Sequence, residues 1–296
     1  MRRIAFLLIA CAVFASSCSY GPYMFNVSET KVDERATSIT DLNEDKQLNP
    51  PGNIEDFGET YAFLIIADPH TGPRVSGSVA ERFLAKYDEW LSKADERDKP
   101  RFIINLGDVL DSGKQSQADT YQEMVERMGS SANDWEKTGK LPHYSVIGNH
   151  DLYASDGWDV WARNFYPHTS YYRFTIGGFS YYFLDTGNGT LGKPQLEDLE
   201  KHLAEDKNAK IVLMHYPVVS DSSFCLQNTV ERNRLLRDFA DGNVKMIFSG
   251  HYHRGDTHRY GGMTEVTVKS FGFNGTALLV TVDNATQSVT WREINF

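Results

Sequence analysis

Six continuous apolar segments constrain the fold of this chain more than any other feature. They lie at residues 61–68, 101–108, 143–151, 181–187, 210–217 and 244–253. Runs of this length without alternating polar residues are typical of strands that are buried on both faces. Such strands need packing partners on each side, so the sequence predicts an α/β protein with layered sheets.

Helical periods separate several of these segments, whereas the C-terminal stretch lacks them. The apolar positions that mark three helices are Val79, Phe83, Tyr87 and Trp90, then Leu196, Leu199 and Leu203, then Leu235, Leu236 and Phe239. Residues 264–272, 276–283 and 288–296 are separated by glycine or Asn/Asp turns without a helical pattern between them. This pattern predicts an antiparallel meander at the end of the chain.

The N-terminus reads as a targeting segment. Arg2 and Arg3 precede an apolar run at residues 4–15, which is too short to cross a bilayer and is typical of an export signal. Cys18 follows small residues in a pattern that resembles the lipobox of bacterial lipoproteins, and Cys11 is a less favoured second candidate. We therefore expect residues 1–18 to be a signal peptide with a lipid anchor at Cys18, the alternatives being simple secretion and an uncleaved anchor helix.

The remaining organisation follows from composition. Residues 19–59 are polar and have no sustained apolar period, which predicts a tether, and residues 60–296 are expected to form one domain. The expected location is the bacterial cell envelope, as a lipid-anchored or periplasmic protein, or else secretion. A net charge of -10 without a Lys/Arg stripe excludes duplex nucleic acid as the main partner. Cys225 and Cys18 alone follow the predicted signal sequence, so an internal disulfide framework is excluded.

Five of the apolar segments end in residues that bind metals. In chain order these residues are Asp68 and His70, Asp108 and Asp111, Asn149 and His150, His215, and finally His251 and His253. The crevice beyond the carboxyl ends of strands is where layered α/β folds bind ligands, so we expect these side chains to converge. Oxygen and nitrogen ligands without a thiolate suit divalent ions such as Mn, Fe or Zn. Each motif is weak alone, and their order and strand context give the signal its strength.

Together these motifs resemble the full signature of the calcineurin-like metallophosphoesterase superfamily. The matching stretches, from about residue 61 to 253, are Asp68-Pro69-His70, residues 107–111, Gly148-Asn149-His150-Asp151, His215, and Gly250-His251-Tyr252-His253. The resemblance implies a four-layer α/β/β/α sandwich with mixed sheets and a dinuclear metal centre. It also implies hydrolysis of phosphomonoesters or phosphodiesters by a hydroxide that bridges the two metals.

The resemblance assigns roles to nine residues. The first metal would be held by Asp68, His70, Asp108 and His253, and the second by Asp108, Asn149, His215 and His251, with Asp108 as the bridge. His150 would act near the leaving group, oriented by Asp111. Purple acid phosphatases resemble this pattern but carry a tyrosine ligand near the position of Asp111, so that subgroup is disfavoured.

Other residues near the motifs receive structural interpretations. Asp151 is expected to organise its loop, Gly148 to allow a sharp turn, and Arg74 and Arg254 to be exposed. His143, His168, His202 and His258 have no motif context and are interpreted as structural or surface residues.

A catalytically silent surface binding or scaffold protein with the same fold is the alternative function. The presence of His150 and all seven candidate ligands weighs against it. The substrate, the identity of the metals and the oligomeric state stay open.

Overall fold

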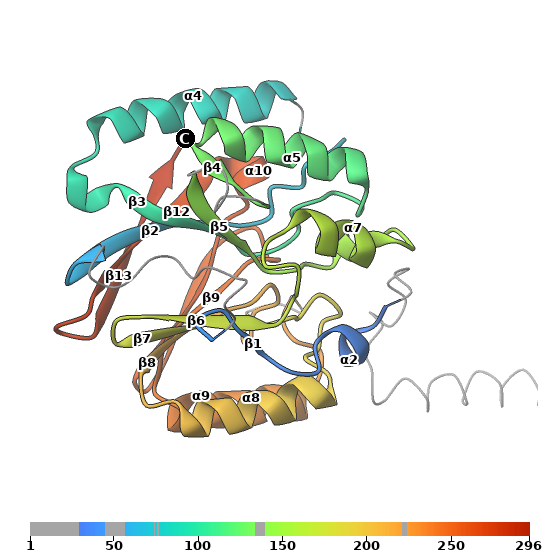
Figure 1. Ribbon diagram of the computed structural model, residues 1–296, viewed down its shortest axis with the longest axis vertical. Helices are drawn as coiled ribbons and strands as arrows, with labels where there is room; N and C mark the ends of the chain where they lie inside the picture. The colour runs from blue at the N-terminus through green and yellow to red at the C-terminus, as the bar shows by residue number, and fades with distance from the viewer. Residues whose placement is uncertain (1–29, 45–56, 74, 76, 134–139, 221–223) are drawn as a thin grey trace, which may run out of the picture.

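Two mixed β-sheets pack face to face in the computed structural model, with helices on both outer faces (Figure 1). The structure describes residues 30–44, 57–73, 75, 77–133, 140–220 and 224–296. Helices α4, α5 and α7 cover one sheet, and α8 and α9 cover the other. The predicted four-layer α/β/β/α sandwich is therefore confirmed.

The first sheet has six strands in the order β13-β12-β2-β3-β5-β4. Its strands are β2 (Thr60–Ile66), β3 (Pro100–Asn105), β4 (Ser130–Ser131), β5 (Leu141–Ser145), β12 (Thr276–Asp283) and β13 (Ser288–Asn295). Its helices are α4 (Gly77–Lys93), α5 (Gln115–Arg127) and α7 (Gly157–Asn164). Strand β2 has apolar side chains on both faces because alternate residues pack against the other sheet and against the helices. The continuous apolar run at this strand follows from that double burial.

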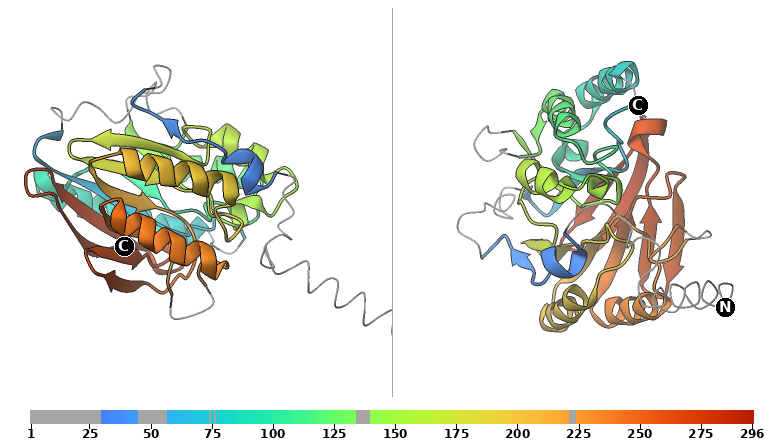
Figure 2. Two further views of the ribbon diagram at one scale, coloured as in Figure 1. Left: turned by 90° about the horizontal axis from the view of Figure 1, so that it is seen from below. Right: turned by 90° about the vertical axis from the view of Figure 1, so that its right-hand side faces the viewer.

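The second sheet has seven strands in the order β1-β6-β7-β8-β9-β11-β10. Its strands are β1 (Thr40–Asp41), β6 (Tyr172–Ile176), β7 (Phe179–Phe183), β8 (Ala209–Leu213), β9 (Val244–Ser249), β10 (Asp256–Tyr260) and β11 (Met263–Thr267). Helices α8 (Lys193–Glu205) and α9 (Thr229–Asp241) lie side by side on its outer face, as the view from below shows (Figure 2). Four short helices complete the described fold: α2 (Val32–Arg35), η2 (Glu96–Asp98), η3 (His150–Leu152) and α10 (Phe271–Asn274).

Aromatic rings fill the layer between the two sheets. Phe63 and Phe102 on the first sheet stack with their centroids 4.7 Å apart, and Phe174 and Tyr181 on the second stack at 4.9 Å. The Phe102 ring meets the Tyr181 ring edge-on at 5.9 Å, across the interface. Edge-on and offset ring pairs stabilise beyond their buried area, so this layer holds the two sheets at a defined separation.

The predicted C-terminal meander is wrong in part. Strand β11 pairs parallel with β9 in the seven-stranded sheet, and α10 separates it from β12. Strands β12 and β13 do form the predicted antiparallel hairpin. Ser270 is the N-cap of α10, and its hydroxyl accepts a hydrogen bond from the backbone nitrogen of Phe273.

The predicted tether is corrected for residues 30–44. Strand β1 pairs parallel with β6, and the side chains of Val32, Ala36 and Leu42 are buried. The Arg35 guanidinium donates to both carboxylate oxygens of Asp185, at 2.6 and 3.0 Å, and both side chains are inaccessible to solvent. A single turn of helix and a two-residue strand are too short to produce a visible apolar period, which explains the missed assignment.

The rest of the predicted tether and the predicted signal peptide with Cys18 lie outside the described residues. Within the part of the chain that is described, no helix combines the length and the apolar character needed to span a bilayer.

Candidate metal centre and active site

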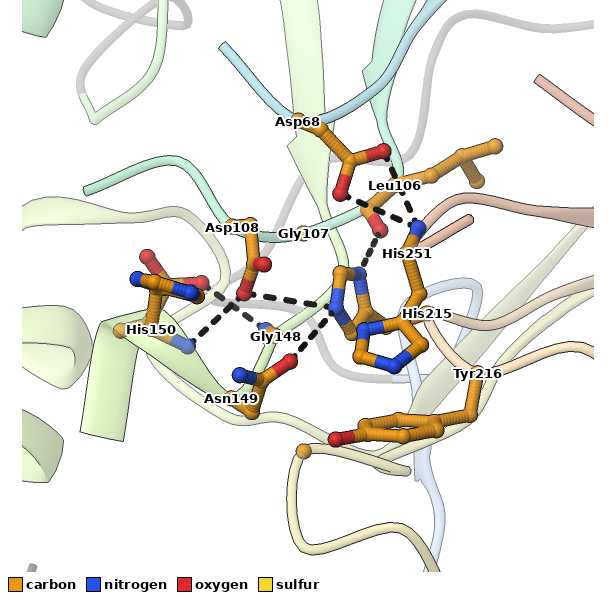
Figure 3. A network of polar contacts seen from close by, with 12 residues as sticks. Asp68, Leu106, Gly107, Asp108, Gly148, Asn149, His150, His215, Tyr216 and His251 are labelled. Carbon is orange, nitrogen blue, oxygen red and sulfur yellow. Dashed lines mark hydrogen bonds and ion pairs between the residues drawn. The ribbon is translucent and has the colours of Figure 1, made fainter. Parts of the chain in front are cut away.

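The predicted ligands lie beyond the carboxyl ends of five strands, three in one sheet and two in the other. Figure 3 shows Asp68, Asp108, Asn149, His215 and His251 among them. Strands β2, β3 and β5 of the six-stranded sheet lead to Asp68 and His70, to Asp108, and to Asn149. Strands β8 and β9 of the seven-stranded sheet lead to His215, and to His251 and His253. Because the two sheets face each other, both sets of strand ends open onto the same place, as the sequence predicted.

The first cluster joins Asp68, His70, Asp108 and His253, whose ligand atoms lie within 4.8 Å of one another. The Nε2 atoms of His70 and His253 are 3.1 Å apart, and His253 Nε2 is 3.3 Å from Asp68 Oδ1. Two imidazole nitrogens and two carboxylates that point at one small volume form a donor set suited to a divalent cation.

The second cluster shares Asp108 and adds His215 and His251. His215 Nε2 lies 3.3 Å from Asp108 Oδ1 and 3.1 Å from Asn149 Oδ1. Its Nδ1–H donates to the carbonyl of Leu106 at 2.8 Å, so Nε2 is the ring nitrogen that faces the two oxygen atoms. These three acceptor atoms repel one another unless a proton or a cation lies between them.

Burial and charge set the protonation of these histidines. Burial lowers the pKa of His70 to about 4 and that of His251 to about 3, so both rings are neutral at neutral pH. Burial opposes charge on His215 as well, but the carboxylates of Asp108 and Asp68 outweigh it and raise its pKa to about 9. His251 Nε2 is buried and has no hydrogen-bond partner among the described residues. The histidine nitrogens and carboxylates of the two clusters therefore suit a bound cation.

The backbone at the predicted ligands is strained. Asp68, His70, Asp108, His251 and His253 all have positive φ angles, between 46° and 67°. Residues other than glycine rarely adopt this left-handed region, and such strain persists where the surrounding structure imposes it, which happens most often at functional sites. Five of the eight such residues in the described chain are predicted ligands, so the strain is concentrated at this centre.

Two glycines are required by close approach between the motifs. A Cβ atom on Gly148 would collide with the backbone nitrogen and the carboxylate of Asp108, and one on Gly250 would lie 2.7 Å from Asp68 Oδ2. Gly148 does not have a positive φ angle. The close approach to Asp108, and not the backbone conformation, is therefore what requires glycine at this position.

His150 lies beside the first cluster and is held by the backbone. Its Nδ1–H donates to the main-chain carbonyl of Asp111 at 2.8 Å, which leaves the exchangeable proton at Nε2. The carboxylate of Asp111 lies 3.8 Å from His70 Nδ1. The orienting contact predicted for Asp111 is thus made by its carbonyl, and its carboxylate faces a predicted ligand.

Asp151 ties two ligand loops together, as its structural interpretation predicted. Its carboxylate accepts from the backbone nitrogens of Leu110 and Gly148, each at 2.8 Å. Burial, followed by repulsion from Asp108, raises the pKa of Asp151 to about 7.

Two supports of the centre escaped the sequence analysis. Buried Glu265 accepts from the backbone nitrogens of Val218 and Val219, at 2.7 and 3.1 Å, and so fixes the loop that follows His215. The hydroxyl of Ser270 donates to the carbonyl of Asp68 at 2.7 Å, which docks α10 against the first cluster. Ser270 and Gly275 could have been recognised as helix caps, whereas an isolated buried glutamate gives no sequence signal.

None of the described residues that were interpreted as peripheral belongs to either cluster. Arg254 is exposed, and Arg74 lies outside the described residues. His143 is fully buried and its Nε2 accepts from the hydroxyl of Tyr121 at 3.0 Å, while His168 is exposed. Cys225 is buried, and the Arg232 guanidinium donates to its Sγ atom at 3.0 Å.

Comparison with known proteins places this arrangement in a family. Residues 61–255 match the family model for calcineurin-like phosphoesterases. The chain belongs to the calcineurin-like phosphoesterase family. All seven predicted ligands and His150 lie within the matched range, so the family's match and the two clusters coincide.

Two curated proteins and one solved structure illustrate the calcineurin-like relatives. A "Probable cyclic nucleotide phosphodiesterase" of Fibrobacter succinogenes is 30% identical over 124 residues, which cover 40% of this chain and 48% of the relative. A serine/threonine-protein phosphatase of Danio rerio is 25% identical over 203 residues, covering 59% of this chain and 60% of the relative. The chain thus spans about half to three fifths of the length of these two proteins.

The solved structure of a dimetal phosphatase from Danio rerio superposes with a TM-score of 0.54 at 12% identity, covering 80% of this chain and 99% of that one. At this level of identity the superposition bears on the fold alone.

Proposed function

We propose that this chain is a hydrolase of phosphoric esters that works with two divalent metal ions. The observation that carries the proposal is the pair of ligand clusters that share Asp108. The family match and the phosphodiesterase and phosphatase names of its relatives support the same class of reaction. Manganese, iron and zinc all suit the nitrogen and oxygen donors.

In this proposal some side chains of the centre bind the metal ions and one transfers a proton. Divalent ions at such a centre supply charge stabilisation for phosphate oxygens and a nucleophile at neutral pH. Asp108 belongs to both clusters and so joins the two halves of the centre. Asn149 offers a neutral oxygen, which adds a ligand without adding charge. His150 donates a proton to the leaving oxygen from Nε2 in this proposal, because its Nδ1–H is engaged by the carbonyl of Asp111.

The proposal is tested by a metal-reconstituted hydrolysis panel. The chain is loaded with Mn, Fe or Zn and assayed on a nitrophenyl monoester, a bis-nitrophenyl diester, cyclic nucleotides and phospholipids. We expect two bound ions per chain and turnover of at least one ester. Fewer than two ions, together with no hydrolysis under any metal, would favour the alternative of a silent binding or scaffold protein.

His150→Ala separates chemistry from metal binding. We expect two ions to stay bound while turnover falls by about 10²- to 10⁴-fold, most strongly for esters with poor leaving groups, because proton donation matters most there. His168→Ala is the matched control, since His168 is an exposed histidine outside the clusters. Unchanged turnover in His150→Ala would contradict the assigned role.

The proposed setting of this activity is the bacterial cell envelope, and its support is the sequence of residues 1–18. Labelling with a radioactive fatty acid, followed by membrane fractionation, tests the anchor. We expect label on the native chain and on Cys11→Ser, and none on Cys18→Ser. Label that persists in Cys18→Ser would show that the proposed anchor site is wrong.

A further inference from the structure

Exposed aromatic side chains gather at the metal centre. Four large hydrophobic side chains are exposed in the described chain, and they are Tyr153, Phe224, Val230 and Phe273. The three aromatic ones each pack against a predicted site histidine, and we call Tyr153, Phe224 and Phe273 the aromatic rim. Val230, which is 76% exposed on α9, is the aliphatic exception.

The aromatic rim surrounds the centre from three separate segments. The Tyr153 ring lies 4.2 Å from that of His150, directly after η3. Phe273 on α10 lies 5.5 Å from His70 and 5.4 Å from His253, beside the first cluster. Phe224, in the segment before α9, lies 5.7 Å from His251 beside the second cluster. Each part of the centre therefore has an aromatic neighbour.

The position of Phe273 is fixed by the same backbone that holds Asp68. The nitrogen of Phe271 donates to the carbonyl of Ala67 at 2.7 Å, and the nitrogen of Gly272 donates to the carbonyl of Asp68 at 3.3 Å. Phe273 is nevertheless 47% exposed as a residue, and Phe224 is 46% exposed. Apolar surface held in water beside a reaction centre is costly unless a ligand covers it.

We propose that the aromatic rim stacks on a planar aromatic group carried by the substrate, as a nucleobase is carried by a nucleotide. The inference rests on the proposed function and narrows its substrate to phosphoric esters whose organic part contains a flat ring. The phosphate would lie at the two clusters, and the ring would meet Phe224 or Phe273 a short distance away.

The chemistry of the rim favours a planar ring over an acyl chain. An acyl chain needs a continuous apolar groove, whereas here imidazoles and carboxylates lie between the rim residues. Isolated aromatic faces next to polar groups are what base-stacking sites provide, since every base offers a π-face. A phosphoserine peptide would bring no ring to the position next to its phosphate.

The test compares two ligands that differ only in the ring. They are the phosphonate analogues of AMP and of ribose 5-phosphate, in which a CH2 group replaces the ester oxygen so that turnover cannot interfere. In calorimetric titration of the full, metal-loaded chain, the AMP analogue should bind about 5- to 150-fold more tightly than the ribose analogue, the range expected for one stacked base.

Variants that remove a ring while keeping apolar volume complete the experiment. In Phe273→Leu, in Phe224→Leu or in both single variants, the ratio of the affinity for the AMP analogue to that for the ribose analogue should fall toward one. The affinity for the ribose analogue itself should stay unchanged. Val230→Ala is the control and should keep the native preference, because it changes exposed apolar surface away from the rim.

Several results would overturn the inference. They are equal affinities for the two analogues in the native chain, a preference that survives in both leucine variants, or an equal loss of affinity for both analogues. Tighter binding of octyl phosphonate than of the AMP analogue would point to lipid instead. A preserved ring preference without hydrolysis of any ester would contradict only the proposed function, because the titration does not depend on turnover.

Discussion

Single residues at the centre are constrained by contacts between motifs that are distant in the sequence. Gly148 and Gly250 each lie where a methyl group would collide with a ligand from another loop. Asp151 in turn bonds the nitrogens of two loops at once. The ligand loops are thus fitted to one another at the level of single atoms.

Gly148→Ala should therefore weaken metal binding without unfolding the chain. The added methyl group must displace Asp108, and overpacking of this kind costs ~1–3 kcal/mol, or about a 5- to 150-fold loss in metal affinity. Metal analysis after dialysis against a weak chelator measures the effect. Gly262→Ala is the control because nothing lies within 4 Å of its added Cβ. Equal metal retention by both variants would contradict the steric argument.

His143 gives a prediction for the pH dependence of stability. Burial lowers its pKa to about 3 in the folded chain, whereas an unfolded histidine titrates near 6.5. Below about pH 6.5 the unfolded chain takes up a proton that the folded chain does not, so the free energy of unfolding falls as the pH falls. Between pH 7 and pH 5 this residue alone should remove about 2 kcal/mol.

Urea unfolding of the native chain and of His143→Gln at both pH values checks this number. The glutamine cannot take up the proton, so the variant should lose about 2 kcal/mol less stability over the same interval. Equal losses in the two chains would show that His143 does not carry the dependence.

At the scale of elements, a buried ion pair holds the short N-terminal helix α2 against the rest of the domain. Helix α2 is a single turn, and Arg35 links it to Asp185 beyond β7 and to the side chain of Asn188. Removing one partner of a buried pair leaves the other charge uncompensated, which costs ~3–5 kcal/mol. Arg35→Met should lower the free energy of unfolding by about this amount.

The double variant Arg35→Met/Asp185→Asn should recover part of that loss in chemical denaturation, because the isolated charge is gone. Lys93→Met is a control, since the pair between Lys93 and Glu89 is exposed, and it should leave the midpoint unchanged. A similar loss in the single and double variants would mean that the pair itself contributes little.

Local pattern predicted the long elements and failed for the short ones. Strand β2 and helix α8 extend over several periods of burial, which makes their type readable from the sequence. Strand β1 has two residues and α10 has four, too few for a period to appear. Strand β11 was recognised as a strand, but its parallel pairing with β9 is decided by long-range packing that its own residues do not encode.

At the scale of the whole molecule, metal binding should stabilise the fold, because both sheets contribute ligands to each cluster. An ion present at 100 times its dissociation constant adds about 2.7 kcal/mol, which corresponds to a Tm rise of roughly 5–10 °C for a domain of this size. Calorimetric scans with manganese and with EDTA measure the difference. Asp108→Asn should abolish most of it, and identical Tm values for the native chain in the two buffers would contradict the prediction.

The convergence of the ligands was predictable, and its fine geometry was not. The motifs could be recognised in the sequence because five buried strands each lead to a residue of a metal-binding type. The carboxyl ends of strands in layered α/β folds open onto a common crevice. The contributions of Glu265 and Ser270 depend on backbone atoms of other loops, which no local pattern records. The aromatic rim was hidden for the same reason, because Phe224 and Phe273 look like ordinary core residues until the fold leaves them exposed.

The aromatic layer between the sheets has a mechanical consequence. The thickness of the packed rings around Phe102 sets the distance between the two sheets. Each cluster takes side chains from both sheets, so the separation of the sheets also sets how close those side chains lie to one another. A smaller side chain at Phe102 would therefore shift the predicted ligands of one sheet relative to those of the other, without replacing any of them.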